Sequence, residues 1–294
     1  MGCCVCCMDE GAKVESLMNG FAPVPVSKLS AKSGVIKAVG FPLSAASNII
    51  VHPITGVPVV WYNITISETH HWVDKQKNAS GDIEEKEQKR VSTIFENKVG
   101  CEFLLADGDS FTEVDIRGDG QARIKTIHNQ RGTGLPSGNV GPDVRAFLMT
   151  FQRKDLPQEQ EHSEVSVSIG GVSIGFGHQG HKAPLLDKKK NRYEYSWRCS
   201  WVPVGVKIAV VGMIGEGAQG LRLTPCYPGS VGEQEQKEMG WTPKQVKIFG
   251  EEAGKGGAIF VSTTDEAMLS CAVAPSKIQQ PQIAYGVEYK QSQM

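Results

Sequence analysis

The sequence has no long hydrophobic run and no excess of positive charge. Its longest apolar segment, GVKIAVVGMIG at 205–215, falls well short of the roughly 20 residues that a membrane-spanning helix needs. The first residues, MGCCVCCMDE, lack the apolar core of a signal peptide, which argues against a secreted disulfide framework. Because 31 basic residues stand against 32 acidic ones, the net charge is −1 and there is no general attraction to nucleic acid. Nucleic acid is therefore not an expected partner.

Paired cysteines are also missing from most of the chain. Four of the eight cysteines crowd into positions 3–7, and the others stand alone at Cys101, Cys199, Cys226 and Cys271. A structural zinc site draws its ligands from closely spaced pairs, which these isolated residues do not offer. We therefore predict that the four internal cysteines are small buried residues in a reducing compartment. Neither a metal nor another cofactor is expected.

The N-terminus is typical of a lipid anchor. Gly2 lies where removal of Met1 exposes the amine that N-myristoylation requires, although position 6 holds Cys in place of the usual Ser or Thr. One myristoyl chain binds a bilayer only weakly, so stable anchoring needs a second signal. Residues 1–40 contain four lysines and three acidic residues, and a net charge of 4 − 3 = +1 is too small for an electrostatic anchor. The second signal is then S-palmitoylation, and the candidate lipidation residues are Gly2, Cys3, Cys4, Cys6 and Cys7.

Two other interpretations of these cysteines stay open at this point: a small metal site, and an exposed thiol tail without a role. A metal site would need further ligands on the other side of the ion, and no second Cys or His pair lies near in the sequence. Acylation is the preferred interpretation. It predicts a peripheral, lipid-anchored protein on the cytoplasmic face of a membrane.

What the sequence does contain is a regular succession of strand patterns. Short segments rich in Val, Ile, Phe and Tyr alternate with turns that use many of the 33 glycines and 15 prolines, and helical periodicity is almost absent. This pattern predicts a mainly β fold, an antiparallel barrel or sandwich in two β-rich halves. The expected strands lie at 34–40, 57–66, 90–95, 101–106, 111–116, 121–127, 145–151, 164–171, 193–201, 206–214, 221–225, 245–250 and 258–263.

The domain organisation follows from the breaks between these patterns. Residues 1–30 are assigned to the acylated anchor and a proline-interrupted linker, and 31–274 to the β domain, with halves at about 31–128 and 144–274. Residues 275–294 are expected to form a flexible tail. The charged segment at 74–90 lacks an apolar stripe and is expected to be a solvated loop. TTDE at 263–266 matches a capping box and predicts one short helix near 264–270.

Three glycine patterns invite a catalytic interpretation, and each fails on its requirements. GVSIG at 171–175 matches a nucleophile elbow, but the helix and the later acid–histidine pair of a hydrolase are missing after Ser173. GFGHQG at 175–180 would have to open a helix to bind a dinucleotide, which the following glycines and Pro184 prevent. GEEAGKGG at 250–257 has the wrong spacing for a phosphate-binding loop. Turn glycines explain all three patterns, so no catalytic residue is assigned.

The histidines do not make a metal site by their spacing. His70 and His71 would point to opposite faces of a strand, so they could not share an ion. His178 and His181 could do so in a loop, but no further ligand can be named for them. They are interpreted as surface histidines, and no metal ligand is assigned.

The stretch HPITGVPVVWYNITISE at 52–68 resembles the opening of the GIDE-type domain of membrane-anchored RING-type ubiquitin ligases, the mitochondrial and chloroplast type. In that family a P-[LI]-[ST]-G-x-P segment precedes an apolar strand with a tyrosine. The pattern is matched here by Pro53, Ile54, Thr55, Gly56, Pro58 and Tyr62. Segments 101–122, 193–216 and 246–269 look like later parts of the family in the same order, so the resemblance spans roughly 34–274.

The corner itself is interpreted as scaffold. Gly56 supplies a turn and Pro58 restricts the backbone, so together they are expected to direct Trp61 and Tyr62 into the core. No chemistry is assigned to this segment.

The chain departs from the family where catalysis would reside. A RING needs eight Cys or His ligands around two zinc ions, whereas only four isolated cysteines follow Cys7 here. Ligase catalysis by this chain alone is therefore not expected, and acyl chains would replace the family's transmembrane helices. The preferred hypothesis is a membrane-tethered, non-catalytic binding or regulatory module. Its protein partner is unknown, with the ubiquitination machinery as one candidate.

Two alternatives stay open. The chain could be a ubiquitin-ligase component that acts with a separate RING partner, or a structural protein of the cell cortex or cilium. One compact basic cluster could contact anionic headgroups at about 1 kcal/mol per residue, or simply form a solvated loop. It consists of Lys188, Lys189, Lys190 and Arg192.

Overall fold

The computed structural model confirms the predicted fold class, because the chain is mainly β and contains a closed barrel. It describes residues 10–31, 34–44, 50–77, 83–117, 121–151, 168–169, 172–173, 191–218, 220–254, 256–263, 272 and 274. The helices in these ranges are α1 (Glu10–Met18), the 3-10 helix η2 (Val26–Lys28), α2 (Pro142–Thr150), α3 (Glu233–Glu238) and α4 (Pro243–Ala253). None of them is long and apolar enough to cross a bilayer.

The strands follow the predicted pattern over most of the described chain. They are β1 (Pro23–Pro25), β2 (Val35–Ser44), β3 (Ile50–Val51), β4 (Pro58–Lys77), β5 (Ile83–Gly100), β6 (Glu102–Asp107), β7 (Ser110–Asp115), β8 (Ala122–Lys125), β9 (Asn129–Thr133), β10 (Ser168–Ile169), β11 (Val172–Ser173), β12 (Asn191–Pro203), β13 (Ile208–Gly217), β14 (Gly220–Thr224) and β15 (Ile259–Ser262).

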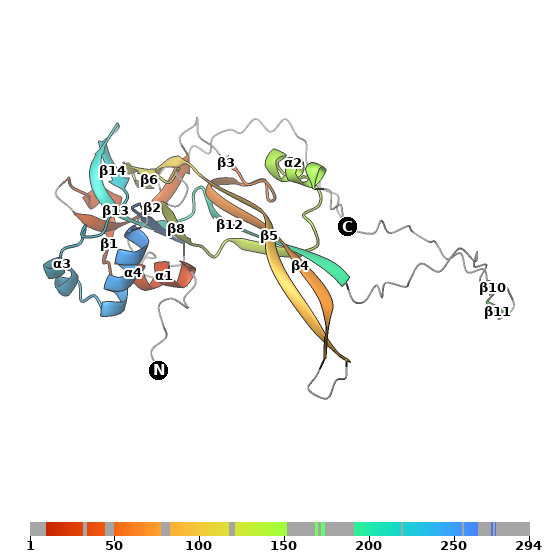
Figure 1. Cartoon of the computed structure of the whole chain (residues 1–294). Coiled ribbons are helices and arrows are strands. Elements are labelled where there is room, and N and C mark those ends of the chain that lie inside the picture. The colour runs from red at the N-terminus through yellow and green to blue at the C-terminus, as the bar shows by residue number, and fades with distance from the viewer. Residues whose placement is uncertain are drawn as a thin grey trace. The chain divides into compact units, whose positions relative to one another are not determined.

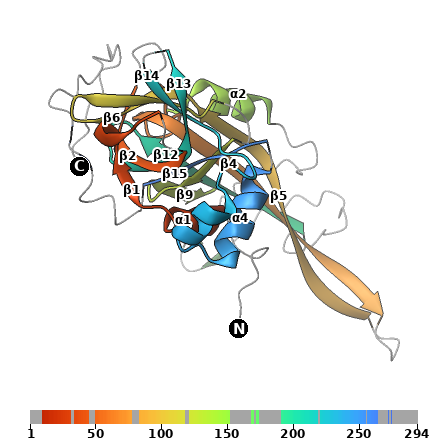
Figure 2. The same ribbon diagram turned by 90° about the vertical axis from the view of Figure 1, so that its left-hand side faces the viewer.

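Five of these strands close into a barrel (Figures 1 and 2). Around the barrel they follow the order β2-β6-β7-β14-β13, and β13 pairs back to β2. The labelled strands β2, β6, β13 and β14 lie close together in both views (Figures 1 and 2). Neighbouring strands are antiparallel except for β7 and β14, which are parallel. This connectivity is that of the OB-fold, a small Greek-key barrel. β1 extends the wall beside β2, and β15 and β8 extend it beside β13.

Side chains alternate between two hydrophobic layers along the barrel strands. On β2, Ala38 belongs to the interior layer, whereas Val39 packs in an outer layer that includes residues of α1 and α4. On β13, Val210 and Val211 divide between the same two layers. This period of two lets one strand line the barrel and carry the helices at once. Each fully buried aliphatic or aromatic side chain contributes about 1.5–3 kcal/mol.

A second unit comprises residues 66–95 and 133–197, and the rest of the chain belongs to the unit with the barrel. The second unit contains α2 and parts of β4, β5 and β12, and β4 pairs with both of the other two strands. The ring centroid of Phe147 lies 4.7 Å from that of Phe95, and the Phe151 centroid lies 5.8 Å from that of Tyr195. These aromatic contacts attach α2 to the sheet of its own unit.

This division differs from the predicted halves at 31–128 and 144–274. The second unit is formed by two insertions, one between β2 and β6 and the other between β7 and β13. Its strands are therefore contributed by both predicted halves. The prediction placed one boundary at the polar break at 129–143, which would make each unit continuous in sequence. In the structure both units are discontinuous.

The linker expected within 8–30 is also replaced by ordered elements. Val14, Leu17, Met18 and Phe21 are buried in the outer hydrophobic layer, and β1 pairs with β2. Their spacing of i, i+3, i+4 and i+7 is that of an amphipathic helix, so the signal for α1 was present in the sequence. The proline-rich segment that follows continues as β1 at the wall of the barrel.

Two predicted strands are helices in the structure. Segment 145–151 lies largely within α2, and 245–250 lies within α4. Each helix begins with a proline in its first turn, and Thr242 and Gln245 form a capping box on α4. The expected loop at 74–90 is mostly strand, because β4 and β5 continue through its charged residues. The short helix near 264–270 and the tail at 275–294 lie outside the described residues.

The corner after His52 turns as predicted. The Gly56 amide donates to the His52 carbonyl at 2.9 Å, and Gly56 has a φ of 71°. Trp61 and Tyr62 are only 6% and 5% exposed. The corner therefore delivers two aromatic side chains into buried surroundings.

The pairing of β2 with β6 depends on a glycine. A Cβ atom on Gly40 would lie 2.5 Å from the carbonyl oxygen of Ala106, which is main chain and cannot rotate away. We expect Gly40→Ala to lower the free energy of unfolding by about 1–3 kcal/mol, measured by urea denaturation. Gly34→Ala is the matched control, because its new methyl group would find only Glu235 at 3.9 Å. Equal stability of the two variants would contradict this assignment.

Candidate functional site

The residues predicted to carry lipid lie outside the part of the chain that the structure describes; they are Gly2, Cys3, Cys4, Cys6 and Cys7. The first described residue is Glu10, where α1 begins. How α1 is held therefore determines how an anchor at the N-terminus would connect to the barrel.

A buried lysine on the barrel wall holds the C-terminal end of α1. Lys37 on β2 is 2% exposed, and its Nζ atom donates to the carbonyl oxygen of Met18 at 3.0 Å. The last carbonyl groups of a helix lack partners within it, and the Met18 carbonyl accepts both this bond and one from the Phe21 amide at 3.2 Å. Lys37 thus links α1 directly to a strand of the closed barrel.

Two side chains near the start of α4 hold the same end of α1. The Gln245 amide donates to Ser16 O at 2.9 Å, and the Trp241 indole donates to Gly20 O at 3.0 Å. Gly20 has no side chain in the path of the indole, since a Cβ atom there would lie 2.6 Å from Trp241 Nε1. Together with Lys37, these bonds form what we call the α1 clamp.

A buried ionic cluster connects α1 to α4 and β8. Glu252 on α4 accepts from Arg123 Nε on β8 at 2.7 Å and from Lys13 Nζ on α1 at 3.1 Å. The Arg123 and Glu252 side chains are only 8% and 5% exposed. Removal of one partner from such a cluster leaves a buried charge uncompensated, which costs several kcal/mol. α1, α4 and β8 are therefore held together by charge as well as by apolar packing.

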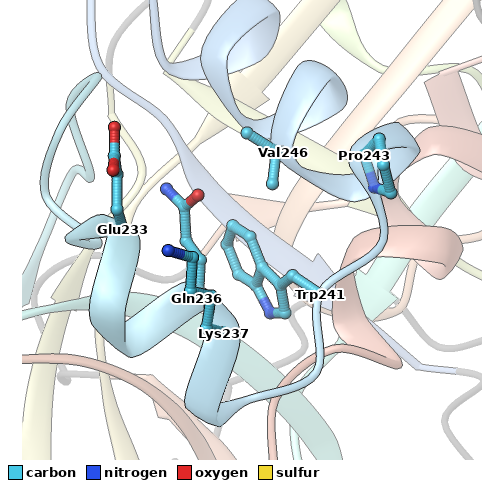
Figure 3. A pocket seen from close by; sticks show the side chains of 6 residues that line it. All are labelled: Glu233, Gln236, Lys237, Trp241, Pro243 and Val246. Atoms are coloured by element: carbon cyan, nitrogen blue, oxygen red, sulfur yellow. The ribbon is translucent and has the colours of Figure 1, made fainter.

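Beside the clamp, α3 and α4 form a recess of about 280 Å³ (Figure 3). Figure 3 shows the Trp241 indole lying between the α3 side chains and the α4 residues Pro243 and Val246. The same indole makes edge contacts with Phe21 and Phe249, at centroid distances of 5.1 and 5.4 Å. The complete lining consists of Glu233, Gln236, Lys237, Trp241, Pro243 and Val246.

The recess combines an apolar surface with two charged side chains. Its volume is below the roughly 300–1,000 Å³ of sites that enclose a cofactor or a drug-sized ligand. Trp241 and Val246 supply an apolar surface, and Glu233 and Lys237 add one charge of each sign. Tryptophan is enriched among the residues that contribute most binding energy in protein interfaces. We refer to this site as the Trp241 recess.

The internal cysteines that the structure describes are free thiols, and they are buried as predicted. Burial raises the pKa of Cys101 and Cys226 to about 12 and that of Cys199 to about 11. Each thiol is therefore protonated at neutral pH and is a poor nucleophile. Cys271 lies outside the described residues.

His52 is a structural histidine at the centre of the corner. Its Nδ1 atom accepts from the amides of Ile54 and Thr55 at 3.3 and 3.1 Å, and its ring packs against Tyr62 and Trp201. Its Nε2 atom is buried and has no hydrogen-bond partner among the described residues. Burial lowers the pKa of His52 to about 4, so the ring is neutral at pH 7.

Two arginines and two carboxylates form a partly exposed charge cluster on and next to β6, β7 and β14. Arg117 and Arg222 lie 2.8 and 2.7 Å from Asp115, and 3.3 and 3.5 Å from Glu102. The hydrogen bond from Arg117 helps to lower the pKa of Asp115, which keeps that carboxylate charged. OB-folds that bind oligonucleotides use this region of the barrel. Here each guanidinium is matched by carboxylates, an arrangement that does not favour a phosphate backbone.

The predicted headgroup cluster is described only at one residue. Lys188, Lys189 and Lys190 lie outside the described residues. Arg192 on β12 has atoms 3.5 Å from a Glu194 oxygen and 3.8 Å from a Glu87 oxygen. Its charge is therefore already paired with carboxylates of the same unit.

The neighbouring histidines on β4 face opposite sides, as expected for a strand. His70 stacks on Tyr193 at a centroid distance of 4.3 Å, whereas His71 Nε2 lies 3.4 Å from an oxygen of Glu194. Within the ranges described, no group of three or more His, Cys, Asp or Glu side chains is arranged to hold a metal ion. His178 and His181 lie outside those ranges.

Comparison with known proteins identifies no relative of this chain. No family model matches the sequence, no curated protein matches it, and no solved structure matches the fold.

Sequence reasoning missed the Trp241 recess and the α1 clamp. The capping pattern at Thr242–Gln245 could have predicted α4 and placed Trp241 just before it. The partners of Lys37 and Glu252 are 19 to 239 residues away, and no local pattern encodes such contacts.

The buried imidazole makes stability depend on pH. Because the folded pKa of His52 is about 4 and its ordinary value is 6.5, the unfolded chain binds the proton more readily. The free energy of unfolding should therefore fall between pH 6.5 and pH 4 by at most about 3 kcal/mol from this residue. His52→Asn keeps an acceptor for the two turn amides but cannot titrate, so its urea midpoint should change less over that range. Identical pH profiles for the two proteins would contradict the assignment.

The ionic cluster makes a second prediction. Arg123→Met should lower the free energy of unfolding by about 3 kcal/mol, because Glu252 would keep its buried charge and lose its closest partner. The double variant Arg123→Met/Glu252→Leu should regain part of that loss, since it removes the buried Glu252 charge and leaves Lys13, which is 16% exposed and lies 4.0 Å from Glu251. Urea denaturation gives the stabilities, and hydrogen exchange of the α1 amides tests whether this helix loosens first. A double variant less stable than Arg123→Met would overturn this account.

Proposed function

We propose that this chain is a lipid-anchored, non-catalytic binding module on the cytoplasmic face of a membrane, similar to the GIDE-type domain of RING-type ubiquitin ligases. Myristate on Gly2 and palmitate on one or more of Cys3, Cys4, Cys6 and Cys7 would supply the anchor. The partner would be a protein that also resides at that membrane.

The α1 clamp is the observation that carries this proposal. α1 begins at Glu10, is attached to β2 and α4 by hydrogen bonds, and is linked to β8 through Glu252. Seven residues lie between Gly2 and Glu10, so the eight Cα–Cα steps of even a fully extended chain span at most about 29 Å. An acyl group at the front would therefore hold the barrel close to the bilayer, with a rigid connection from Glu10 onward.

The Trp241 recess supports the binding part of the proposal. It lies between α3 and α4 and is joined to α1 through the bond from Trp241 to Gly20. A partner side chain in the recess would contact the same helical layer that receives the anchor. Binding and membrane attachment would then act on one face of the protein, which favours a partner already at the membrane surface.

The buried thiols support a structural use of cysteine in the barrel unit. Raised pKa values keep Cys101, Cys199 and Cys226 protonated at neutral pH, in contrast to the thiolates of catalytic or redox cysteines. A ubiquitination assay with purified components distinguishes the non-catalytic proposal from the alternative that this chain is a ubiquitin-ligase component. Ubiquitin transfer without any added RING protein would reject the non-catalytic proposal.

The anchor is tested by cell fractionation. Gly2→Ala removes the N-terminal glycine that N-myristoylation requires, and the protein should move from the membrane fraction to the soluble fraction. Replacement of the four N-terminal cysteines by serine should also release it, because a single myristoyl chain binds only marginally. Gly34→Ala is the control and should stay in the membrane fraction. Unchanged pelleting of Gly2→Ala would reject the anchor.

A further inference from the structure

Strand β5 has a long edge that no other described strand covers. It runs for 18 residues, from Ile83 to Gly100, and among the described strands it pairs with β4. The opposite edge of such a strand presents backbone amide and carbonyl groups that can pair with another chain. Val91 on this strand is 63% exposed.

Among the described residues, the outer part of β5 belongs to a ribbon of two strands. β12 runs antiparallel to β4, because Val204 N donates to Pro58 O at one end and Tyr193 stacks on His70 at the other. β12 begins at Asn191, so β4 and β5 continue past its start as a pair (Figure 1). A two-stranded ribbon is only marginally stable in water and gains from a further strand.

The charge of β5 changes sign along its length. Its first six residues, 83–88, contain three glutamates and one lysine, a net charge of 1 − 3 = −2. Residues 89–98 contain Lys89, Arg90, Lys98 and one glutamate, a net charge of 3 − 1 = +2. A copy of β5 aligned in the opposite direction, with the two-fold axis at Glu87, would place Glu84 opposite Arg90 and Glu85 opposite Lys89, whereas a parallel copy in register would place like charges together.

We infer that β5 pairs antiparallel with β5 of a second copy of this chain, and that the chain is a two-fold symmetric homodimer. Two identical edges related by a two-fold axis across the sheet run antiparallel, which is the orientation that the charges favour. Pairing would continue each sheet into its partner and add a strand to the outer ribbon. The exposed side chain of Val91 would then pack against the other copy.

Charged edges also serve to keep strands apart, and the two roles make opposite predictions. A protective edge leaves the chain monomeric at every concentration. A pairing edge produces a dimer whose strength depends on the order of charges along β5 and decreases with added salt.

The test is a charge exchange in the unacylated full-length chain, purified with a reducing agent so that the N-terminal cysteines cannot cross-link. Lys89→Glu/Arg90→Glu makes most of the paired region negative, and Glu84→Lys/Glu85→Lys makes it positive. Sedimentation equilibrium should show a dimer for the unmodified chain and a dissociation constant at least about ten-fold higher for each variant alone. An equal mixture of the two variants should recover the dimer, because each supplies the charges that the other lost.

The control carries the same change of charge elsewhere. Lys244→Glu/Lys247→Glu lies on the exposed side of α4 and should dimerise like the unmodified chain. A monomer at all concentrations would overturn the inference, and so would a dimer that both β5 variants retain. The lipid anchor plays no part in this test, so its outcome is separate from that of the proposed function.

Discussion

The pairing of β2 with β13 is the contact on which the rest of the structure depends. It closes five strands into a barrel and divides the side chains of both strands between an interior and an outer layer. The outer layer is where α1 and α4 pack, so the closed barrel also creates the surface that receives the N-terminal helix. Two long insertions between barrel strands then supply the second unit, without interrupting the ring.

Buried charge makes that surface specific for α1. Apolar packing alone would allow a short helix to shift along its axis, because hydrophobic contact has no direction. Lys37 binds one chosen carbonyl group, and Glu252 binds one lysine and one arginine from different elements. Misplacement of α1 would break the bonds from Lys37 to Met18 and from Lys13 to Glu252, which lie in largely buried surroundings. The start of the chain is thereby tied to the barrel in one position.

Local signals and distant contacts differ in how far the sequence reveals them. The barrel strands were predictable because β-branched and aromatic residues alternate with turns, as at Val35–Val39 and Ile208–Val211. The apolar spacing of α1 and the capping residues of α4 are sequence patterns that predict helices. The strand patterns around them led instead to a predicted linker and a predicted strand. The closure of β2 on β13 and the partners of Lys37 join segments far apart in the chain. Neither of these contacts can be predicted from a pattern within a short stretch of the sequence.

The central claim is that fatty acyl chains on the first residues hold a barrel whose own first helix is fixed in place. An intact-mass spectrum of the protein isolated from its native membranes tests this most directly. The account predicts a chain that has lost Met1 and carries the added mass of one myristoyl group and at least one palmitoyl group. A chain whose Gly2 and neighbouring cysteines carry no acyl group would contradict it.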